Sequence, residues 1–182
     1  MNASRSGINT DNTLKKYEIP VPFTEAALAA YNGDTSLLSS LPSANLLAVD
    51  ETGNTPLIWC ADKGHKDALR LILEAVAKKD PSSVNTRGYL GNTALSRAAR
   101  GGHVECVIAL LRMSDINPNI ANDKMQYPLH FAAFKRKPEV VRVLLDSKMC
   151  DSTVVDRKGR TPAEDTSDDS IRNMIIESRR SI

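Results

Sequence analysis

A motif that returns roughly every 30 to 40 residues constrains the fold of this chain more than any other feature. The segment Gly53–His65 (GNTPLIWCADKGH) recurs as Gly91–His103 (GNTALSRAARGGH), with shorter copies at Gln126–Ala133 and Gly159–Ala163 and a diluted copy at Thr24–Asp34. A period of this length is typical of stacked arrays, in which each unit buries its apolar face against its neighbours. We therefore predict an elongated array and not a globule with one closed core. Arrays of this kind usually bind other macromolecules.

Each copy is predicted to fold as two helices joined by a tight turn. In the second unit, the Thr55 hydroxyl is placed to cap the first helix, and Pro56 takes the first helical position, where its missing N–H costs nothing. Gly64 is placed to end this helix, because glycine accepts the positive φ of a helix C-terminus. A second helix is expected from Lys66, and its apolar residues recur at helical spacing. They are Ala68, Leu69, Ile72 and Leu73.

The composition agrees with closely packed helices in a soluble protein. Only 4% of the 182 residues are aromatic and 41% are apolar, so the core must be built from Ala, Leu, Val and Ile. Cys60, Cys106 and Cys150 form no CxxC pair, which indicates neither a zinc site nor a disulfide framework and fits a reducing compartment. The sequence shows no secretory signal and no run of ~20 apolar residues. We expect no membrane partner, and a cytoplasmic protein that could also enter the nucleus.

The repeated residues resemble those of a known family. Thr-Pro-Leu followed by Ala-Ala and Gly-His, entered through Asp-x-x-Gly, is similar to the ankyrin repeat, and the likeness covers residues 21–177. The resemblance implies an all-α fold, a solenoid of about five helix–turn–helix units with short β-hairpin fingers before each first helix. The units are expected at residues 21–49, 50–85, 86–121, 122–154 and 155–177, after a flexible N-terminal arm at 1–20 and before a frayed C-terminus at 178–182.

Departures from the family pattern lead to specific expectations. Met125 replaces the finger glycine of the fourth unit and Arg136-Lys137 replaces its Gly-His, so the turn geometry there is left open. Thr55 and Thr93 are 38 positions apart, so residues 75–83 should hold a longer second helix or a bulged loop. The fifth unit is polar where small apolar residues belong, as a C-terminal cap requires.

No arrangement of residues indicates catalysis or a bound cofactor. The sequence lacks a Gly-x-Ser-x-Gly elbow, a phosphate-binding Gly-rich loop and a His-Glu-x-x-His pair, so we expect neither an enzyme nor a cofactor. His103 and Cys106 have a spacing that could suit a metal, but Cys106 falls on the apolar stripe and is predicted to be core. The resemblance implies that His65, His103 and His130 form hydrogen bonds to neighbouring loops.

The resemblance also implies a partner-binding surface on the concave side of the array. In the family, finger tips and the outward positions of the first helices line this groove. A non-catalytic protein–protein interaction module is therefore expected, acting as an adaptor, inhibitor or assembly scaffold. Aromatic and Arg side chains, which often dominate binding energy, fall at several of these positions. Transferred position by position, the candidate partner-binding residues are Tyr31, Asn32, Glu51, Thr52, Asn54, Asp62, Lys63, Tyr89, Leu90, Asn92, Arg100, Lys124, Gln126, Phe134, Lys135, Arg157, Lys158 and Arg160.

The charge distribution adds a preference to this groove. Residues 86–160 hold 13 Lys and Arg against 7 Asp and Glu, whereas residues 1–85 hold 8 against 10. We therefore expect a protein partner with an acidic or phosphorylated segment, and a monomer when the chain is alone. An alternative is nucleic acid or another polyanion bound by the basic surface of units three to five, although a pI near 8.4 is mild for this. Many of these charges could also be ordinary solvated residues, and the sequence leaves open whether Trp59 is in the core or the groove.

Overall fold

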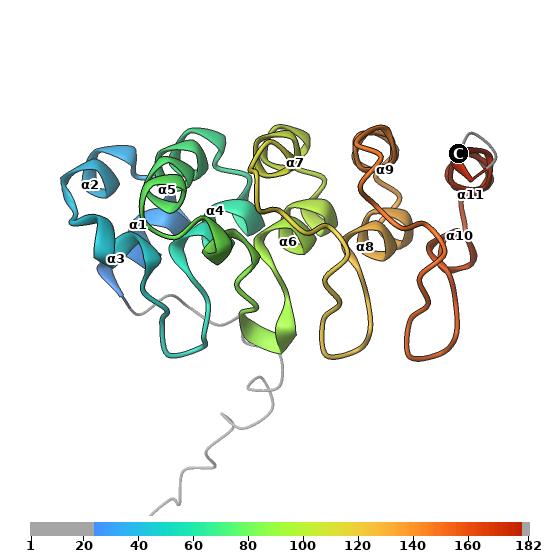
Figure 1. Ribbon diagram of the computed structural model, residues 1–182, viewed down its shortest axis with the longest axis horizontal. Coiled ribbons are helices and arrows are strands. Elements are labelled where there is room, and N and C mark those ends of the chain that lie inside the picture. Colours follow the sequence, from blue (N-terminus) through green and yellow to red (C-terminus); the bar gives the residue numbers. More distant parts are fainter. Residues whose placement is uncertain (1–23, 180–182) are drawn as a thin grey trace, which may run out of the picture.

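The computed structural model describes residues 24–179 as an elongated stack of helix pairs (Figure 1), which confirms the predicted all-α solenoid. The expected arm at 1–20 and residues 180–182 lie outside the described part; Arg179, which follows the last helix, lies inside it. Of the C-terminus at 178–182 that was expected to fray, residue 178 is the last residue of α11. The inner helices are α1 (Glu25–Asn32), α4 (Pro56–Lys63), α6 (Ala94–Gly101), α8 (Pro128–Phe134) and α10 (Pro162–Asp165). The outer helices are α2 (Thr35–Ser40), α5 (Lys66–Lys79), α7 (Val104–Leu111), α9 (Pro138–Asp146) and α11 (Asp169–Ser178).

The inner helices begin and end at the residues that the repeat pattern marks. The hydroxyls of Thr24, Thr55 and Thr93 accept hydrogen bonds from backbone N–H groups of the first turn, at 3.1, 3.3 and 3.2 Å. Gly64 ends α4 and Gly102 ends α6, with φ values of 77° and 85° that glycine adopts readily. These caps satisfy backbone groups that a helix end leaves unpaired, so a similar short helix forms in each of these units.

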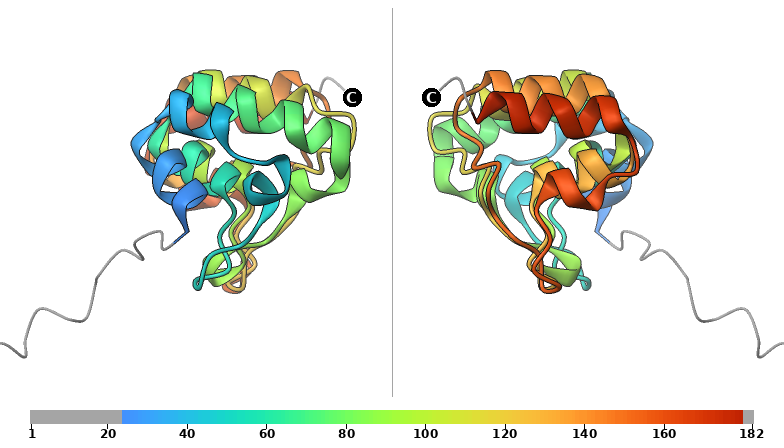
Figure 2. Two further views of the ribbon diagram at one scale, coloured as in Figure 1. Left: turned by 90° about the vertical axis from the view of Figure 1, so that its left-hand side faces the viewer. Right: turned by 90° about the vertical axis from the view of Figure 1, so that its right-hand side faces the viewer.

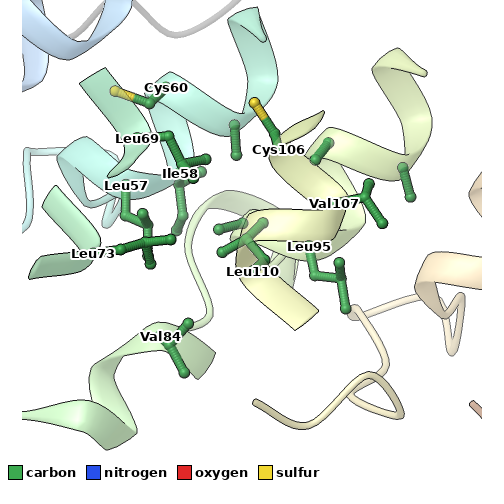
Figure 3. Packing of buried hydrophobic residues seen from close by; sticks show 14 of the residues in the cluster. Leu57, Ile58, Cys60, Leu69, Leu73, Val84, Leu95, Cys106, Val107 and Leu110 are labelled. Carbon is green, nitrogen blue, oxygen red and sulfur yellow. The ribbon is translucent and has the colours of Figure 1, made fainter. Parts of the chain in front are cut away.

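The core is a continuous layer of small and branched aliphatic side chains between the inner and outer helices. Ala61, Ala99 and Ala133 on the inner helices are fully buried, and their small size lets adjacent units approach closely. Larger side chains of the outer helices, including Leu69 and Leu110, pack into the same cluster (Figure 3). Neighbouring units share this core, so the stability of the stack depends on contacts between nearest neighbours.

The long spacing between the second and third units has two structural causes. Helix α5 has 14 residues whereas α7 has 8, and the 3-10 helix η1 (Pro81–Asn85) follows α5. Of the two alternatives expected for residues 75–83, the longer second helix is present, and a 3-10 helix follows it in place of a bulged loop. A further short helix that the repeat pattern does not mark, α3 (Ser43–Leu47), packs against α4 and α5 with Leu46 buried.

The last unit ends the stack with polar groups, some of which are buried. Helix α10 has only four residues, and Asp165 and Thr166 at its end are 7% and 3% exposed. Arg172 of α11 donates a hydrogen bond to the backbone carbonyl of Thr166 at 2.9 Å. The polar cap expected here therefore forms through internal hydrogen bonds as well as through contact with solvent.

The segments between units form fingers that all project to the same side of the stack (Figure 2). In the finger at 50–54, the Asp50 N–H donates to the Asn54 carbonyl and the Gly53 N–H donates to the Asp50 carbonyl, both at 2.9 Å. The fingers at 88–92, 122–126 and 156–160 repeat this pair of bonds. No β-strand occurs within residues 24–179. The short β-hairpins implied by the resemblance are therefore tight hairpin-like turns without paired strands.

Candidate partner-binding groove

Three of the four fingers are held in shape by the side chain of their first residue. Oδ1 of Asp50 accepts hydrogen bonds from backbone N–H groups two and four residues later, at 2.8 and 3.0 Å. Asn122 and Asp156 repeat both bonds at 2.8 to 2.9 Å. Burial opposes ionisation of Asp156, but hydrogen bonds from Arg160 and Lys158 hold the pKa of this carboxyl below its usual value. These bonds fix the positions of the finger tips.

Each finger takes the number of the unit that it opens, so 50–54 is the second finger and 156–160 is the fifth. The third finger lacks such a side chain, because its first residue is Gly88. Instead, Oδ1 of Asn54 in the preceding finger accepts a hydrogen bond from the Tyr89 N–H at 2.9 Å. Leu90 then has φ 57° and ψ 26°, in the left-handed region that leucine rarely adopts. In the other three fingers only the fourth residue has a positive φ, and Met125 takes this conformation at 58° in the place of glycine.

Hydrogen bonds also join consecutive fingers. The Asp123 N–H donates to the Leu90 carbonyl at 3.1 Å, and the Arg157 N–H donates to the Lys124 carbonyl at 3.3 Å. The Asp123 carboxylate forms an ion pair with Arg87 at 2.7 Å. The backbone carbonyl oxygen of Asp123 accepts a hydrogen bond from the Arg157 guanidinium at 2.5 Å. The tips of the third, fourth and fifth fingers therefore form one connected row.

Two adjoining hollows lie along this row of tips and the exposed ends of α6 and α8. Their volumes are about 500 and 530 Å³, and both are lined by Lys124, Gln126, Phe134 and Arg157. Phe134, the last residue of α8, is 53% exposed although it is aromatic. The surface is named here the basic groove and is defined by its exposed lining residues, Leu90, Arg100, Asp123, Lys124, Phe134, Lys135, Arg157 and Lys158.

Most cations of the basic groove have no carboxylate partner. Within residues 24–179, neither Arg100, Lys124, Lys135 nor Lys158 forms an ion pair. The Lys135 ammonium lies 5.4 Å from the centre of the Phe134 ring, a cation–π distance. A concave surface with uncompensated positive charge attracts acidic groups and speeds their encounter.

Arg160 differs from these cations because its charge is compensated. Its guanidinium lies 3.1 Å from the Asp156 carboxylate and 2.7 Å from the Asp165 carboxylate. The Asp165 side chain is only 1% exposed, and the ion pair with Arg160 balances its charge. Arg160 therefore stabilises the last unit and is poorly placed to give its charge to a partner, although the sequence suggested a binding role.

Comparison with known proteins now decides the family. A model of three ankyrin repeats matches residues 26–122, and a model of a single ankyrin repeat matches residues 126–157. The chain belongs to the ankyrin repeat family. Ankyrin repeats are non-catalytic modules for protein–protein interaction, so the general function expected from the sequence is confirmed at this level.

Similar curated proteins are much longer than this ankyrin chain. XBAT31 of Arabidopsis thaliana is 36% identical over 144 residues, which cover 70% of this chain and 30% of that protein. The E3 ubiquitin-protein ligase XBAT33 of the same plant is 36% identical over 92 residues, covering 50% of this chain and 17% of the ligase. The ankyrin repeat and KH domain-containing protein mask-1 of Caenorhabditis elegans is 28% identical over 127 residues, covering 69% and 5%. This chain thus spans less than a third of each relative.

The first two ankyrin units place their candidate residues outside the basic groove. Tyr31 is half-buried with the Lys63 ammonium 4.1 Å from its ring centre, and Asp62 lies 3.5 Å from Arg97. Both contacts therefore occupy side chains that were expected to bind a partner. Asn32 and Glu51 of these units are exposed but line neither hollow, and the same holds for Tyr89 of the third unit.

Two candidate residues are buried: Asn54 has a structural role, which corrects its transfer from the family pattern, whereas Asn92 also lines the hollow of about 500 Å³. Asn54 and Asn92 are 1% and 7% exposed, and both form hydrogen bonds to the backbone of the third finger. The Thr52 hydroxyl is also used internally, since it donates to Asp50 at 2.6 Å. Conversely, the acidic lining residues of the hollows were not expected from the sequence, because finger spacing carries no information on side-chain direction. These are Asp123, Asp156 and Asp165.

The histidines of the ankyrin units have the connecting role that the resemblance implied. Nε2 of His65 lies 2.9 Å from a carbonyl oxygen of α1, and Nε2 of His103 lies 3.0 Å from a carbonyl oxygen of α4. Each therefore connects its unit to the preceding one. His130 makes the opposite connection, because its Nε2 lies 2.9 Å from the Arg160 carbonyl of the following unit.

The cysteines and acidic side chains form no metal or nucleophile site in the described part of the chain. No group of three or more His, Cys, Asp or Glu residues is arranged to hold a metal ion there. Cys106 is 1% exposed, as predicted, and burial raises its pKa to about 11. Burial also raises the pKa of Cys150 to about 12, so both thiols stay protonated at neutral pH. None of the described helices is long and apolar enough to span a bilayer.

Proposed function

We propose that this ankyrin array binds an acidic segment of a partner protein in its basic groove. The observation that carries the proposal is the exposed Phe134 ring, which lies among cations that have no carboxylate partner. A central aromatic residue with a polar rim is the usual composition of a specific protein interface. The uncompensated cations favour an acidic occupant, since carboxylates would supply the missing partners.

The rigidity of the finger row supports this function. The tips are connected by backbone hydrogen bonds and by the Arg87–Asp123 ion pair, so binding would order few groups that are free beforehand. Association loses free energy when side chains and loops become immobile, and a pre-formed surface reduces that loss. The basic groove is therefore suited to hold an extended segment along three units.

The similarity to longer relatives bears on the role of this surface and not on catalysis. XBAT33 is named an E3 ubiquitin-protein ligase, but this chain matches only 17% of it. We therefore assign to this chain the recognition of a partner protein and no ligase activity. Such recognition suits an adaptor, an inhibitor or an assembly scaffold.

A second candidate function is the binding of nucleic acid or another polyanion, and the same free cations favour it. Such binding depends on counterion release, so its affinity falls steeply with salt and tolerates changes of sequence. However, three carboxylates line the same hollows, and although Arg87 and Arg160 pair with them, Asp123 is exposed and the buried Asp156 and Asp165 lie at the wall of the hollow of about 530 Å³. These carboxylates disfavour a continuous row of phosphates, whereas a peptide can place neutral residues beside them.

Charge reversal in the basic groove tests the proposal. A fluorescently labelled, glutamate-rich peptide of about ten residues with one central Phe serves as the probe, measured by anisotropy at ~0.05 and ~0.2 M salt. We expect Arg100→Glu combined with Lys124→Glu to weaken binding by about tenfold or more, because two attractive charges become repulsive. Thermal unfolding should change little, since both side chains are exposed and unpaired.

A matched variant controls for the change in net charge. Arg112→Glu with Arg142→Glu makes the same change on exposed positions at the end of α7 and on α9, outside the basic groove. This control should bind the peptide as the wild type does. Equal loss in both variants would show that only overall charge matters, and tighter binding of a single-stranded RNA than of the peptide would favour the polyanion alternative.

A further inference from the structure

Leu90 combines two properties that folding does not explain. It is 49% exposed at the tip of the third finger, and its φ of 57° lies where leucine is rarely found. It belongs neither to the buried core nor to the side chains packed against it. Its carbonyl accepts the hydrogen bond from the Asp123 N–H, but a glycine would present the same carbonyl. Strained positions that contribute nothing to folding are concentrated at functional sites.

Phe134 is the second exposed apolar side chain of the same hollow. Leu90 and Phe134 both line the hollow of about 500 Å³, Leu90 from the finger side and Phe134 from the end of α8. The residue at the position of Phe134 in the preceding unit is the charged Arg100, so the repeat does not require an aromatic side chain there. Two unrelated departures from the repeat thus place apolar groups in one cavity.

Four cations line the same hollow as this apolar pair, and so does the Asp123 carboxylate, which pairs with Arg87. Arg100 and Lys135 line the same hollow, and Lys124 and Arg157 line both hollows. The hollow therefore offers apolar contact beside positive charge on several sides.

We propose that the basic groove selects an acidic segment carrying one large apolar side chain, which inserts between Leu90 and Phe134 while neighbouring carboxylates contact the surrounding cations. This inference rests on the proposed function and specifies the sequence pattern of the partner, acidic–apolar–acidic. The apolar insertion supplies a part of the affinity that salt does not screen, because burial of apolar surface is not an electrostatic effect. The carboxylates supply the salt-dependent part.

A pair of peptides measures the contribution of the apolar side chain. Both peptides have about ten residues rich in Glu and Gly, and they differ only at the centre, where one has Phe and the other Ala. With the wild-type array we expect the Phe peptide to bind about tenfold more tightly, which is the size of effect that a buried aromatic side chain commonly has at an interface. The ratio should persist at ~0.2 M salt, while both affinities fall.

A double-mutant cycle assigns this preference to the two residues. In Leu90→Gly and in Phe134→Ala, the ratio of the affinities for the Phe peptide and the Ala peptide should shrink towards one, because one contact of the inserted side chain is missing. Leu90→Gly should also unfold at the same or a higher temperature than the wild type, since glycine relieves the left-handed conformation. A loss of preference in a variant that is not destabilised cannot come from partial unfolding.

Met125 provides a matched control. It has a φ of 58° and is 45% exposed at the tip of the next finger, but it lines neither hollow. Met125→Gly should therefore keep the tenfold ratio. A ratio near one in the wild type, an unchanged ratio in Leu90→Gly, or an equal loss in Met125→Gly would overturn the inference.

These outcomes separate the inference from the proposed function. If both peptides bind equally well and Arg100→Glu with Lys124→Glu still weakens them, the acidic-segment function stands and only the apolar insertion fails. If neither peptide binds, or if a single-stranded RNA of similar length displaces the Phe peptide with equal affinity, both proposals fail.

Discussion

The indole Nε1–H of Trp59 donates a hydrogen bond of 2.7 Å to Oδ2 of Asp50, nine residues earlier in the chain. The other carboxylate oxygen of Asp50 accepts from the Thr52 hydroxyl and from two backbone N–H groups of the second finger. One buried carboxylate therefore connects the shape of the finger to the inner helix α4. Trp59 is 3% exposed, which places it in the core and not in the groove.

The first prediction concerns this connection. Trp59→Phe keeps an aromatic ring but removes the donor, so Oδ2 of the buried Asp50 loses its hydrogen bond. We expect the free energy of unfolding, measured with urea, to fall by about 1.5–3 kcal/mol, as is typical for bonds to charged groups. Tyr31→Phe is the control, since its ring lies 5.6 Å from that of Trp59 and only a hydroxyl is lost. A loss in Trp59→Phe no larger than in this control would contradict the assigned role of the bond.

The fold could be predicted from the sequence because its determinants are local and repeated. Thr55 caps α4 and Gly64 ends it, whatever the neighbouring units contain. The spacing of apolar residues then identifies the buried face of each helix. Helix α3 could not be predicted in this way, because its single buried residue, Leu46, gives no periodic pattern.

The site was less predictable because it depends on contacts between units. Asn54 occupies a finger position that the family pattern assigns to the groove, but Gly88 in the next finger leaves room for its side chain to turn inward. Arg160 was likewise assigned to the groove, yet Asp165 of the following helix compensates its charge. Such pairings depend on which side chain the adjacent unit presents, and the spacing of residues within one unit carries no information about that side chain.

The second prediction tests the assignment of the outer helix of the third unit. Leu110 points into the shared core (Figure 3) and is fully buried there, whereas its neighbour Leu111 is only partly buried. Leu110→Ala should lower the free energy of unfolding by about 2–5 kcal/mol, because it removes apolar contact and leaves a cavity. Leu111→Ala in the same helix should cost clearly less, and similar costs for both variants would show that the buried face of α7 is wrongly assigned.

The third prediction is a pH dependence that arises from His130, which is 0% exposed. Its Nε2 faces the Arg160 carbonyl, which can only accept, so Nε2 carries the proton and Nδ1 is left without a hydrogen-bond partner in the described structure. Burial lowers the pKa of His130, although the bond to the Arg160 carbonyl and the carboxylates of Asp165 and Asp156 oppose this effect. The folded protein therefore binds a proton at His130 less readily than the unfolded chain.

The sign of the effect follows from this difference. Below a pH of about 6.5 the unfolded chain takes up the proton at His130 while the folded protein does not, so stability falls as the pH decreases, by at most about 1.4 kcal/mol per pH unit. Urea unfolding at several pH values between ~5 and ~7.5 measures this slope. His130→Gln cannot titrate and should have a smaller slope than the wild type. Equal slopes would mean that the acid sensitivity arises at other groups.

The fourth prediction separates two reasons for glycine in the fingers. Gly88 has φ −93°, which any residue can adopt, but a Cβ there would collide with Asn54 and come within 2.8 Å of Ile58 Cδ1. Gly53 has φ 79° and nothing within 4 Å of an added Cβ.

At position 88 the cost is steric, so Gly88→Ala should lower the free energy of unfolding by about 1–3 kcal/mol and Gly88→Asn should lower it more. At position 53 the cost is conformational, so Gly53→Ala should cost about 1–2 kcal/mol and Gly53→Asn less, because asparagine tolerates left-handed backbone. Urea unfolding of the four variants should therefore rank Ala above Asn in stability at position 88 and below it at position 53. The same ranking at both positions would contradict the distinction between a steric and a conformational cost. It would also contradict the claim that Asn54 takes the place of a side chain at position 88 in holding the third finger.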